Sequence, residues 1–155
     1  MRVAAITSAL LAILSTVAHA QSTNVTGEVR EFVKRYIQVS NEGDKSAYVE
    51  MYKDTPNLLM VTLDGVTRGS ASLREDANAM MGTEGAYKIS AGVVDVLPLG
   101  TTRAVAAFPF VAAIATSQGP VQIKGAMTLV LQKEGGKWVI IVDHTSTAVV
   151  ETQSQ

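Results

Sequence analysis

Residues 121–147 read VQIKGAMTLVLQKEGGKWVIIVDHTST and predict two long β-strands joined by a tight turn. The pair Gly135-Gly136 is typical of a two-residue hairpin loop, because glycine adopts the positive φ angles that such loops require. This turn places Glu134 opposite Lys137. Counting outward from it gives the pairs of one face: Leu131 with Ile140, Leu129 with Val142, Met127 with His144, and Gly125 with Ser146.

These pairs form the larger and more apolar face of the hairpin, so we expect that face to pack against helices. His144 and Ser146 then point inward toward a pocket, whereas Asp143 and Thr145 point toward solvent or a dimer partner. A turn of odd length would reverse this relation, because a shift of one residue moves every side chain of a strand to the opposite face.

Three helices are predicted in the first half of the chain. The longest begins at Gly27 and carries one apolar stripe at helical spacing, formed by Val29, Phe32, Val33, Tyr36 and Ile37. A short second helix follows Gly43, with Asp44 as its N-cap. A third begins at Ser70 or Ser72.

The second half of the chain is predicted to be β-strand. Strands over 87–97 and 103–116 precede the hairpin, and a short hairpin around Asp64-Gly65 lies between the second and third helices. Helices followed by a run of antiparallel strands are typical of the α+β class, with the helices on one face of the sheet. A long twisted meander tends to curl, and helices packed into the curl can enclose a pocket.

Three short motifs follow one another along the chain. Residues 41–52 contain NEGD followed by YVEMY, residues 64–69 read DGVTRG, and residues 136–146 read GKWVIIVDHTS. In this order they resemble the nuclear transport factor 2-like superfamily, especially its SnoaL-like (polyketide-cyclase-like) members and related domains of unknown function. The resemblance implies a cone-shaped fold with three N-terminal helices packed on a curved, mainly antiparallel sheet, a pocket at the wide end, and often a homodimer through the outer sheet face. That superfamily includes isomerases, cyclases, hydrolases, dehydratases, ligand binders and scaffolds, so the resemblance implies a fold and not an activity.

The N-terminus has the three parts of an export signal. Met1-Arg2 is positively charged, residues 3–17 are almost all apolar, and Ala18-His19-Ala20 has the small residues that signal peptidase accepts. The apolar run is shorter than the roughly 20 residues that span a bilayer, although an uncleaved anchor is the alternative. We therefore predict a signal peptide at 1–20, cleavage after Ala20, and a periplasmic or secreted protein with no stable membrane span. For the remaining chain we expect a flexible leader at 21–26, a domain that resembles the SnoaL-like type at 27–148 and a flexible tail at 149–155.

Composition excludes several kinds of site. The net charge is −1 and no polybasic patch occurs, which argues against a nucleic-acid partner. The chain has no cysteine, which excludes thiol nucleophiles and thiolate metal sites. Signal cleavage would remove His19 and leave His144 as the sole histidine, so one chain cannot build a multi-histidine metal site. We expect neither a metal nor a cofactor.

His144 is the first candidate for acid–base chemistry, because imidazole titrates near neutral pH. The structural alternative is a neutral histidine at a pocket rim. Asp143 is its rival, but the expected register turns Asp143 outward.

Asp95 is a second catalytic candidate, because it shares a strand face with apolar residues. Burial among them would raise the pKa of its carboxyl. The alternative is that this face is the outer one, in which case Asp95 is solvated. Tyr36 is the third candidate, as a phenol that stabilises an oxyanion.

The predicted ligand-binding residues come from the helices and the last hairpin: Tyr36, Tyr48, Tyr52, Met127, His144, Ser146 and Trp138. Tyrosines at helical spacing are also typical of a core. Arg68 could meet an anionic ligand or simply be solvated, and Arg103 is the one charged group in an alanine-rich strand. Apart from Asp95, no second carboxylate is expected to point into the pocket.

Three functions remain open. The first is an exported protein that binds a small hydrophobic molecule without strong catalysis, as the sparse polar inventory suggests. The second is a cofactor-independent isomerase, cyclase or dehydratase that uses acid–base residues in an apolar pocket. The third is a dimeric interaction module, suggested by small and apolar residues on the outer sheet face such as Val130, Ile141 and Ala126.

Overall fold

The computed structural model describes residues 24–81, 87–116 and 119–150. The predicted signal peptide and its cleavage site lie outside these residues. Helix is already present at 24–26, and the last strand extends to Val150, so regular structure includes residues that the sequence assigned to the leader and the tail. No helix in the described part of the chain is long and apolar enough to cross a bilayer.

The first helix, over residues 24–42, turns the predicted apolar stripe toward the core, with Phe32 and Ile37 partly buried. Val29 and Val33 are completely or almost completely buried, and Tyr36 is 3% exposed. The helix ends at Gly43, whose φ of 71° is in the left-handed region that favours glycine. Asp44 then caps helix α2 (Lys45–Glu50), because its carboxylate accepts a 3.0 Å hydrogen bond from the Ala47 amide.

Helix α3 (Ser70–Met80) begins at Ser70, one of the two serines expected at its start. Its N-cap is Gly69, which has no side chain to make a capping hydrogen bond. Ser70 instead donates a hydrogen bond to Asp54, and Arg74 binds the same carboxylate at 3.1 Å. These contacts join the start of α3 to the loop that follows α2.

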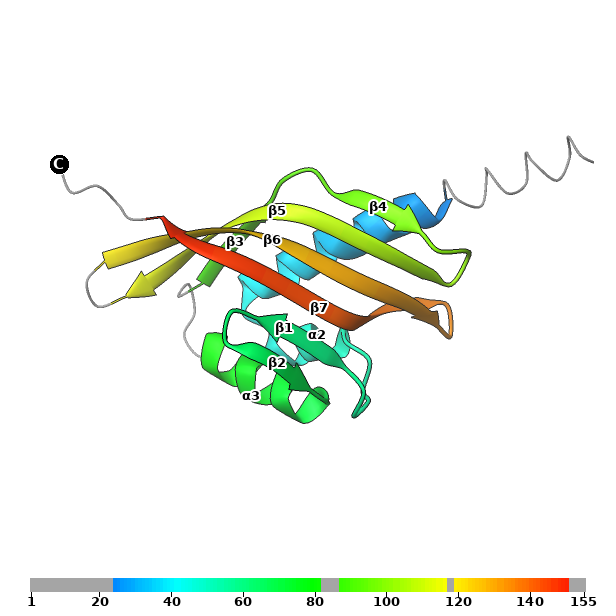
Figure 1. Ribbon diagram of the computed structural model, residues 1–155, viewed down its shortest axis with the longest axis horizontal. Coiled ribbons are helices and arrows are strands. Elements are labelled where there is room, and N and C mark those ends of the chain that lie inside the picture. The colour runs from blue at the N-terminus through cyan, green and yellow to red at the C-terminus, as the bar shows by residue number, and fades with distance from the viewer. Residues whose placement is uncertain (1–23, 82–86, 117–118, 151–155) are drawn as a thin grey trace, which may run out of the picture.

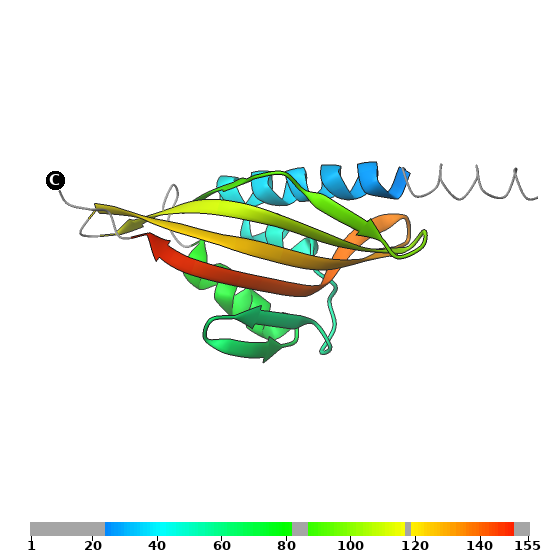
Figure 2. The ribbon, with the colours of Figure 1, turned by 45° about the horizontal axis from the view of Figure 1, so that its top comes forward.

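Seven strands form one mixed sheet in the order β2-β1-β7-β6-β5-β3, with β4 also paired to β5. Their bounds are β1 Leu59–Thr62, β2 Gly65–Arg68, β3 Tyr87–Ala91, β4 Asp95–Pro98, β5 Arg103–Thr116, β6 Gly119–Glu134 and β7 Lys137–Val150. All pairs are antiparallel except β1 with β7. The first helix runs along one face of the curved sheet, and α2 and α3 lie next to the β1–β2 hairpin (Figure 1 and Figure 2). The predicted α+β class, with helices before a mainly antiparallel sheet, is confirmed.

The strand predicted over 87–97 is broken into β3 and β4 at Gly92. The Gly92 amide donates a 2.8 Å hydrogen bond to the Pro109 carbonyl, and a Cβ on Gly92 would lie 2.9 Å from Pro109 Cγ. Because the chain bends here, the face of β3 does not continue into β4. Asp95 is exposed on β4 and does not share a buried face with Tyr87 and Ile89.

The β6–β7 hairpin begins as predicted, with Glu134 opposite Lys137 and Leu131 opposite Ile140. The register then shifts, since Val130 pairs with Val142 and Ile141 is an extra residue in β7. Such a bulge moves all later side chains of one strand to the opposite face. Asp143 is therefore buried on the inner face, whereas His144 is exposed on the outer face. The predicted orientation of the distal half of β7 is wrong for this reason.

Candidate functional site

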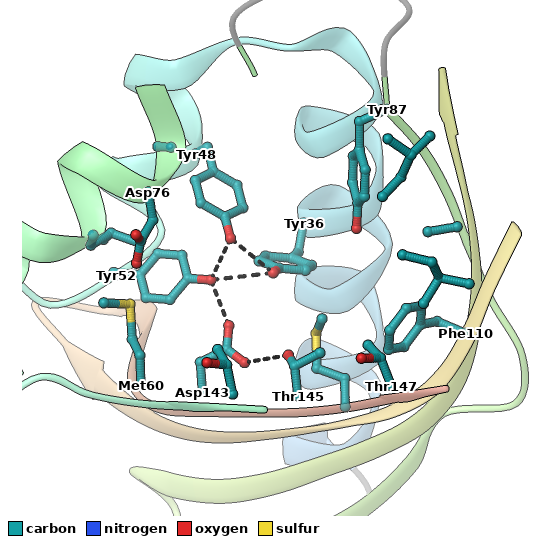
Figure 3. Close-up of a pocket in the computed structure, with 17 residues that line it drawn as sticks. Tyr36, Tyr48, Tyr52, Met60, Asp76, Tyr87, Phe110, Asp143, Thr145 and Thr147 are labelled. Atoms are coloured by element: carbon teal, nitrogen blue, oxygen red, sulfur yellow. Dashed lines mark hydrogen bonds between the residues drawn. The ribbon is translucent and has the colours of Figure 1, made fainter. Parts of the chain in front are cut away.

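A cavity of about 240 Å³ lies between the helices and the inner face of the sheet. Its wall is mostly apolar or aromatic, and its polar groups are hydroxyls and two carboxylates (Figure 3). The described lining residues are Tyr36, Tyr48, Tyr52, Met60, Thr62, Leu73, Asp76, Ala77, Tyr87, Phe110, Ala112, Ile114, Ile123, Met127, Asp143, Thr145 and Thr147.

Three buried tyrosines bring their hydroxyls together on one side of this cavity. Tyr36 lies on the first helix, Tyr48 on α2, and Tyr52 directly after α2. The hydroxyl oxygens of Tyr48 and Tyr52 are 2.8 Å apart, and the Tyr36 oxygen is 3.2 Å from each of them. Figure 3 shows the three hydroxyls pointing toward one another. The helical spacing that is typical of a core therefore also builds a polar cluster.

Asp143 extends the cluster onto the sheet. The Tyr52 hydroxyl donates a 2.7 Å hydrogen bond to Asp143 Oδ2, and Thr145 Oγ1 donates one of 3.1 Å to Oδ1. Asp143 is only 9% exposed, and each of its two carboxylate oxygens accepts one of these hydrogen bonds. The Tyr52 hydroxyl hydrogen is used in its hydrogen bond to Asp143. The hydroxyl hydrogens of Tyr36 and Tyr48 are therefore the two that remain for the three O···O contacts among the tyrosines. One of these three O···O contacts then has no hydrogen between its two oxygens. A ligand with a hydrogen-bond donor could bind to those oxygens.

The electrostatics of the cluster follow from its burial. Removal from water raises the pKa of the Asp143 carboxyl, and this effect exceeds the opposing hydrogen bonds from Tyr52 and Thr145 and the lowering influence of His144. Burial, together with the Asp143 charge, also raises the pKa values of Tyr36, Tyr48 and Tyr52 far above the ordinary phenol range. The phenols therefore remain proton donors, and the carboxylate is a stronger base than an exposed aspartate.

The structure brings four of the predicted ligand-binding residues to the cavity wall: Tyr36, Tyr48, Tyr52 and Met127. His144 and Ser146 lie on the outer face because of the bulge and are exposed. Trp138 is buried elsewhere, where its indole N–H donates a 2.8 Å hydrogen bond to Glu28. These three residues do not line the cavity.

The charged candidates are also displaced from the cavity. Asp95 on β4, Arg68 on β2 and Arg103 at the start of β5 are all exposed and are not lining residues. The catalytic set predicted from sequence is therefore not assembled, since of His144, Asp95 and Tyr36 only Tyr36 reaches the cavity. Asp143, considered as a rival to His144, takes the inward position.

Sequence reasoning also missed Asp76 on α3 and Tyr87 on β3. Asp76 is exposed yet lines the cavity, so it is a second carboxylate on its wall. Helical spacing gives a signal for it, because Asp76 lies three residues after the buried Leu73 and next to the buried Ala77. Tyr87 alternates with the apolar Ile89 along its strand, and this pattern gives no sign that the strand borders a cavity.

No cluster of three metal-ligating side chains occurs among the residues that the structure describes. The described cavity wall offers two carboxylates, of which Asp143 is the buried one, and several phenols in apolar surroundings. Such a site can take a proton from a bound molecule and donate hydrogen bonds to an oxygen on it.

Solved structures with the same fold share little sequence with this chain. A putative scytalone dehydratase from Novosphingobium aromaticivorans superposes with a TM-score of 0.76 at 7% identity, covering 88% of this chain and 93% of the other. A nuclear transport factor 2-like superfamily protein from Salmonella enterica serovar Typhimurium gives 0.70 at 18% identity, covering 86% and 97%. A protein of the same fold and unknown function from Shewanella oneidensis gives 0.67 at 18% identity, covering 78% and 98%.

No protein with a curated description matches the sequence. The model of the SnoaL-like domain family matches residues 29–150, which include the first helix from Val29 onward, α2, α3 and strands β1 to β7 of the described structure. The likeness to solved structures shows the fold, and the family match covers most of the chain. This chain therefore belongs to the SnoaL-like domain family and has the nuclear transport factor 2-like fold.

Proposed function

We propose that the protein is an acid–base enzyme that moves a proton on a small, largely apolar molecule, by isomerisation or dehydration. The observation that carries the proposal is the buried Asp143 carboxylate, held at 2.7 Å by the Tyr52 hydroxyl on the wall of an apolar cavity. A carboxylate is costly to bury. Buried carboxylates that face a cavity and have a raised pKa are typical of functional sites.

Asp143 is the proposed base. In its ionised form it takes a proton from a carbon next to a carbonyl group of the substrate, and the electron pair of that C–H bond forms the C=C bond of an enolate. The negative charge then moves to the carbonyl oxygen. Tyr36 and Tyr48 are the proposed donors to that oxygen, because Tyr52 already donates its proton to Asp143.

The proton held by Asp143 then leaves in one of two ways. Its return to a different carbon of the substrate completes an isomerisation. Its transfer to a leaving hydroxyl group breaks the C–O bond and completes a dehydration, with water as the second product. Both outcomes restore the ionised carboxylate and need no group outside the cavity.

Isotope exchange tests this proposal without knowledge of the natural substrate. Small uncharged ketones are incubated with the protein in D₂O, and the loss of the C–H signal next to the carbonyl is followed by NMR. We expect the protein to accelerate the exchange, Asp143→Asn to lower the rate by about 100-fold or more, and the exposed His144→Ala to keep it. Exchange at the buffer rate with every ketone that binds would overturn the proposal.

Binding without turnover is the second candidate function. It is supported by the mostly apolar and aromatic wall of the cavity, since such walls are common in sites that hold small hydrophobic molecules. In that case Asp143→Asn alters affinity modestly, and no bound ketone exchanges faster than in buffer.

We also propose that two copies associate through the outer face of β5, β6 and β7. This face carries small and apolar side chains such as Val111, Ala126 and Val130, and Val111 is 37% exposed. Light scattering coupled to size exclusion is expected to give the mass of a dimer, and Ala126→Glu to give a monomer. A wild-type monomer at high micromolar concentration contradicts this arrangement.

Export remains part of the proposal and rests on the tripartite sequence of residues 1–20. A bacterial host that expresses the full chain is expected to accumulate a product beginning at Gln21 outside its cytoplasm. Intact mass spectrometry of the fractionated cells distinguishes this product from the uncleaved chain.

A further inference from the structure

Tyr87 presents a hydroxyl to the cavity that no other described residue uses. Figure 3 shows its side chain beside the cavity, away from the Tyr48 and Tyr52 hydroxyls, with no hydrogen bond to the other residues drawn. Tyr87 is half-buried and lacks a partner among the described residues, whereas each of the other three cavity phenols has a hydrogen-bond partner in the cluster around Asp143. A ligand that fills the cavity and expels water would leave the Tyr87 hydroxyl without a partner unless the ligand supplies one.

The position of Tyr87 is well supported by its neighbours. It opens β3 and pairs with Ile114 of β5. Two residues later, the Ile89 amide and carbonyl form hydrogen bonds of 2.7 and 2.8 Å with the Asn41 side chain at the end of the first helix. This double contact joins β3 to the helix that carries Tyr36, so the two phenols are held on a common frame.

The charge of the cavity wall limits what can bind. Among the described lining residues the charged groups are Asp76 and Asp143, and none is basic. An anion would meet the buried Asp143 carboxylate and the exposed carboxylate of Asp76, with no cation on the described wall to compensate the repulsion. Burial and the Asp143 charge raise the pKa of Tyr87 to about 12, so its hydroxyl is a donor at neutral pH. Its partner on a ligand is therefore an uncharged acceptor oxygen.

The size of the cavity limits the ligand further. An engineered cavity of about 150 Å³ accommodates benzene, and in proportion the cavity of about 240 Å³ found in this protein has room for about ten non-hydrogen atoms. That number corresponds to two fused rings or one substituted ring. Phe110, Ile123 and Met127 provide apolar contacts along the wall.

We infer that the ligand is an uncharged one- or two-ring molecule with oxygen functions at both ends, one beside Asp143 and the tyrosine cluster and one bound by the Tyr87 hydroxyl. This inference rests on the proposed use of the cavity by a small apolar molecule, and it adds the charge, the size and the second polar group of that molecule. Tyr87 is in this view a specificity-determining residue and takes no part in the proton transfer.

Fluorescence titration with three naphthalene probes tests the inference. The probes are a naphthol with one hydroxyl, a naphthalenediol with hydroxyls at opposite ends, and a naphthol that carries a carboxylate in place of the second hydroxyl. We expect the wild type to bind the diol about 5- to 10-fold more tightly than the naphthol, which is the range for one hydrogen bond. The carboxylate probe is expected to bind at least about 10-fold more weakly than the diol.

Tyr87→Phe removes one hydroxyl that has no partner in the described structure, so the variant is expected to melt at the wild-type temperature. It should abolish the preference for the diol and leave the affinity for the naphthol unchanged. Equal affinity of the wild type for diol and naphthol, or equal weakening of both probes by Tyr87→Phe, overturns the inference. Tighter binding of the carboxylate probe overturns it as well.

These titrations need no turnover, so they are independent of the proposed proton transfer. If isotope exchange fails while the diol preference and its loss in Tyr87→Phe are observed, the cavity is a specific binding site without catalysis. If exchange succeeds and the preference is absent, the acid–base proposal stands and Tyr87 has no role in selecting the ligand.

Discussion

The Tyr52 hydroxyl and the Asp143 carboxylate, 91 residues apart in the chain, are joined by a hydrogen bond of 2.7 Å. The backbone explains how they meet. Ile140 donates to the Met51 carbonyl and accepts from the Lys53 amide, both at 2.9 Å, so the segment around Tyr52 is paired with β7 just before the bulge. The extra residue Ile141 then turns Asp143 inward, beneath the phenol that this pairing has placed.

Tyr52→Phe is expected to move the pH dependence of activity. The hydrogen bond from Tyr52 lowers the pKa of Asp143 and opposes the effect of burial, so its loss raises that pKa further and shifts the acidic limb of the profile to higher pH. The buried carboxylate also loses a donor, which should lower the free energy of unfolding by about 1–3 kcal/mol.

Tyr48→Phe is the matched control for this change. It removes a phenol oxygen of the same cluster that makes no hydrogen bond to Asp143. Its acidic limb should stay close to that of the wild type. An identical shift in both variants would mean that the cluster as a whole, and not the Tyr52 contact, sets the pKa of Asp143.

The stability of the protein should depend on pH through Asp143. Burial raises the pKa of this carboxyl above its ordinary value of 3.8, so the folded state binds the proton more tightly than the unfolded chain. The resulting stabilisation is fully present below the unfolded pKa and is lost as pH rises through the folded pKa. Urea unfolding of the wild type and of Asp143→Asn over a pH series measures it.

The difference between the two proteins isolates this carboxyl from all others. The free energy of unfolding of the wild type should fall relative to that of Asp143→Asn as pH rises from about 4 toward neutrality, and the variant should be at least as stable at pH 7. Parallel curves over the whole range would show that the carboxyl titrates alike in both states.

Cysteine pairs can test the register of the β6–β7 hairpin, because the chain has no cysteine of its own. Thr128 lies opposite His144 in the structure, and both point outward. The pair Thr128→Cys with His144→Cys should therefore form a disulfide under mild oxidation. The pair Met127→Cys with His144→Cys, opposite each other in an uninterrupted hairpin, should stay reduced. Mass spectrometry after thiol alkylation distinguishes the two results, and the reverse pattern would exclude the bulge.

Gly125→Ala should destabilise the protein by about 1–3 kcal/mol, the usual cost of overpacking. A Cβ at this position would lie 2.1 Å from the Ser146 carbonyl oxygen and 2.8 Å from Phe110 Cε1. Either the strand or the Phe110 ring must move, and Phe110 lines the cavity. Chemical denaturation measures the loss of stability, and weaker binding of the naphthalene probes would report the altered cavity wall.

Gly27→Ala provides a control for the loss of glycine itself. Gly27 lies in the first helix, and apart from its chain neighbours and the nearby helix backbone no atom lies within 4 Å of an added Cβ. Alanine should stabilise the helix by about 0.5–1 kcal/mol. If Gly125→Ala has the same effect, the close approach of β7 and Phe110 to Gly125 is not a constraint on the fold.

Much of the architecture is predictable because it depends on local patterns. Val29, Val33 and Tyr36 recur at helical spacing, and that spacing alone specifies one buried stripe. Gly43 and Asp44 end one helix and cap the next through contacts within a few residues. The break at Gly92 was not predicted, since it depends on a hydrogen bond to Pro109 in another strand.

The α+β class, the order of the elements, the Gly135-Gly136 turn and the tyrosines that face the sheet all follow from local sequence patterns. The choice between Asp143 and His144 as the residue that enters the cavity depends on tertiary contacts. Ile140, Ile141 and Val142 are all β-branched and apolar, so the local pattern fits either face and contains no sign of an extra residue. The bulge lies where the segment around Tyr52 and strand β1 both pair with β7, and these contacts join segments that are distant in the chain. Which of the two side chains lines the cavity therefore depends on long-range packing that a strand pattern cannot encode.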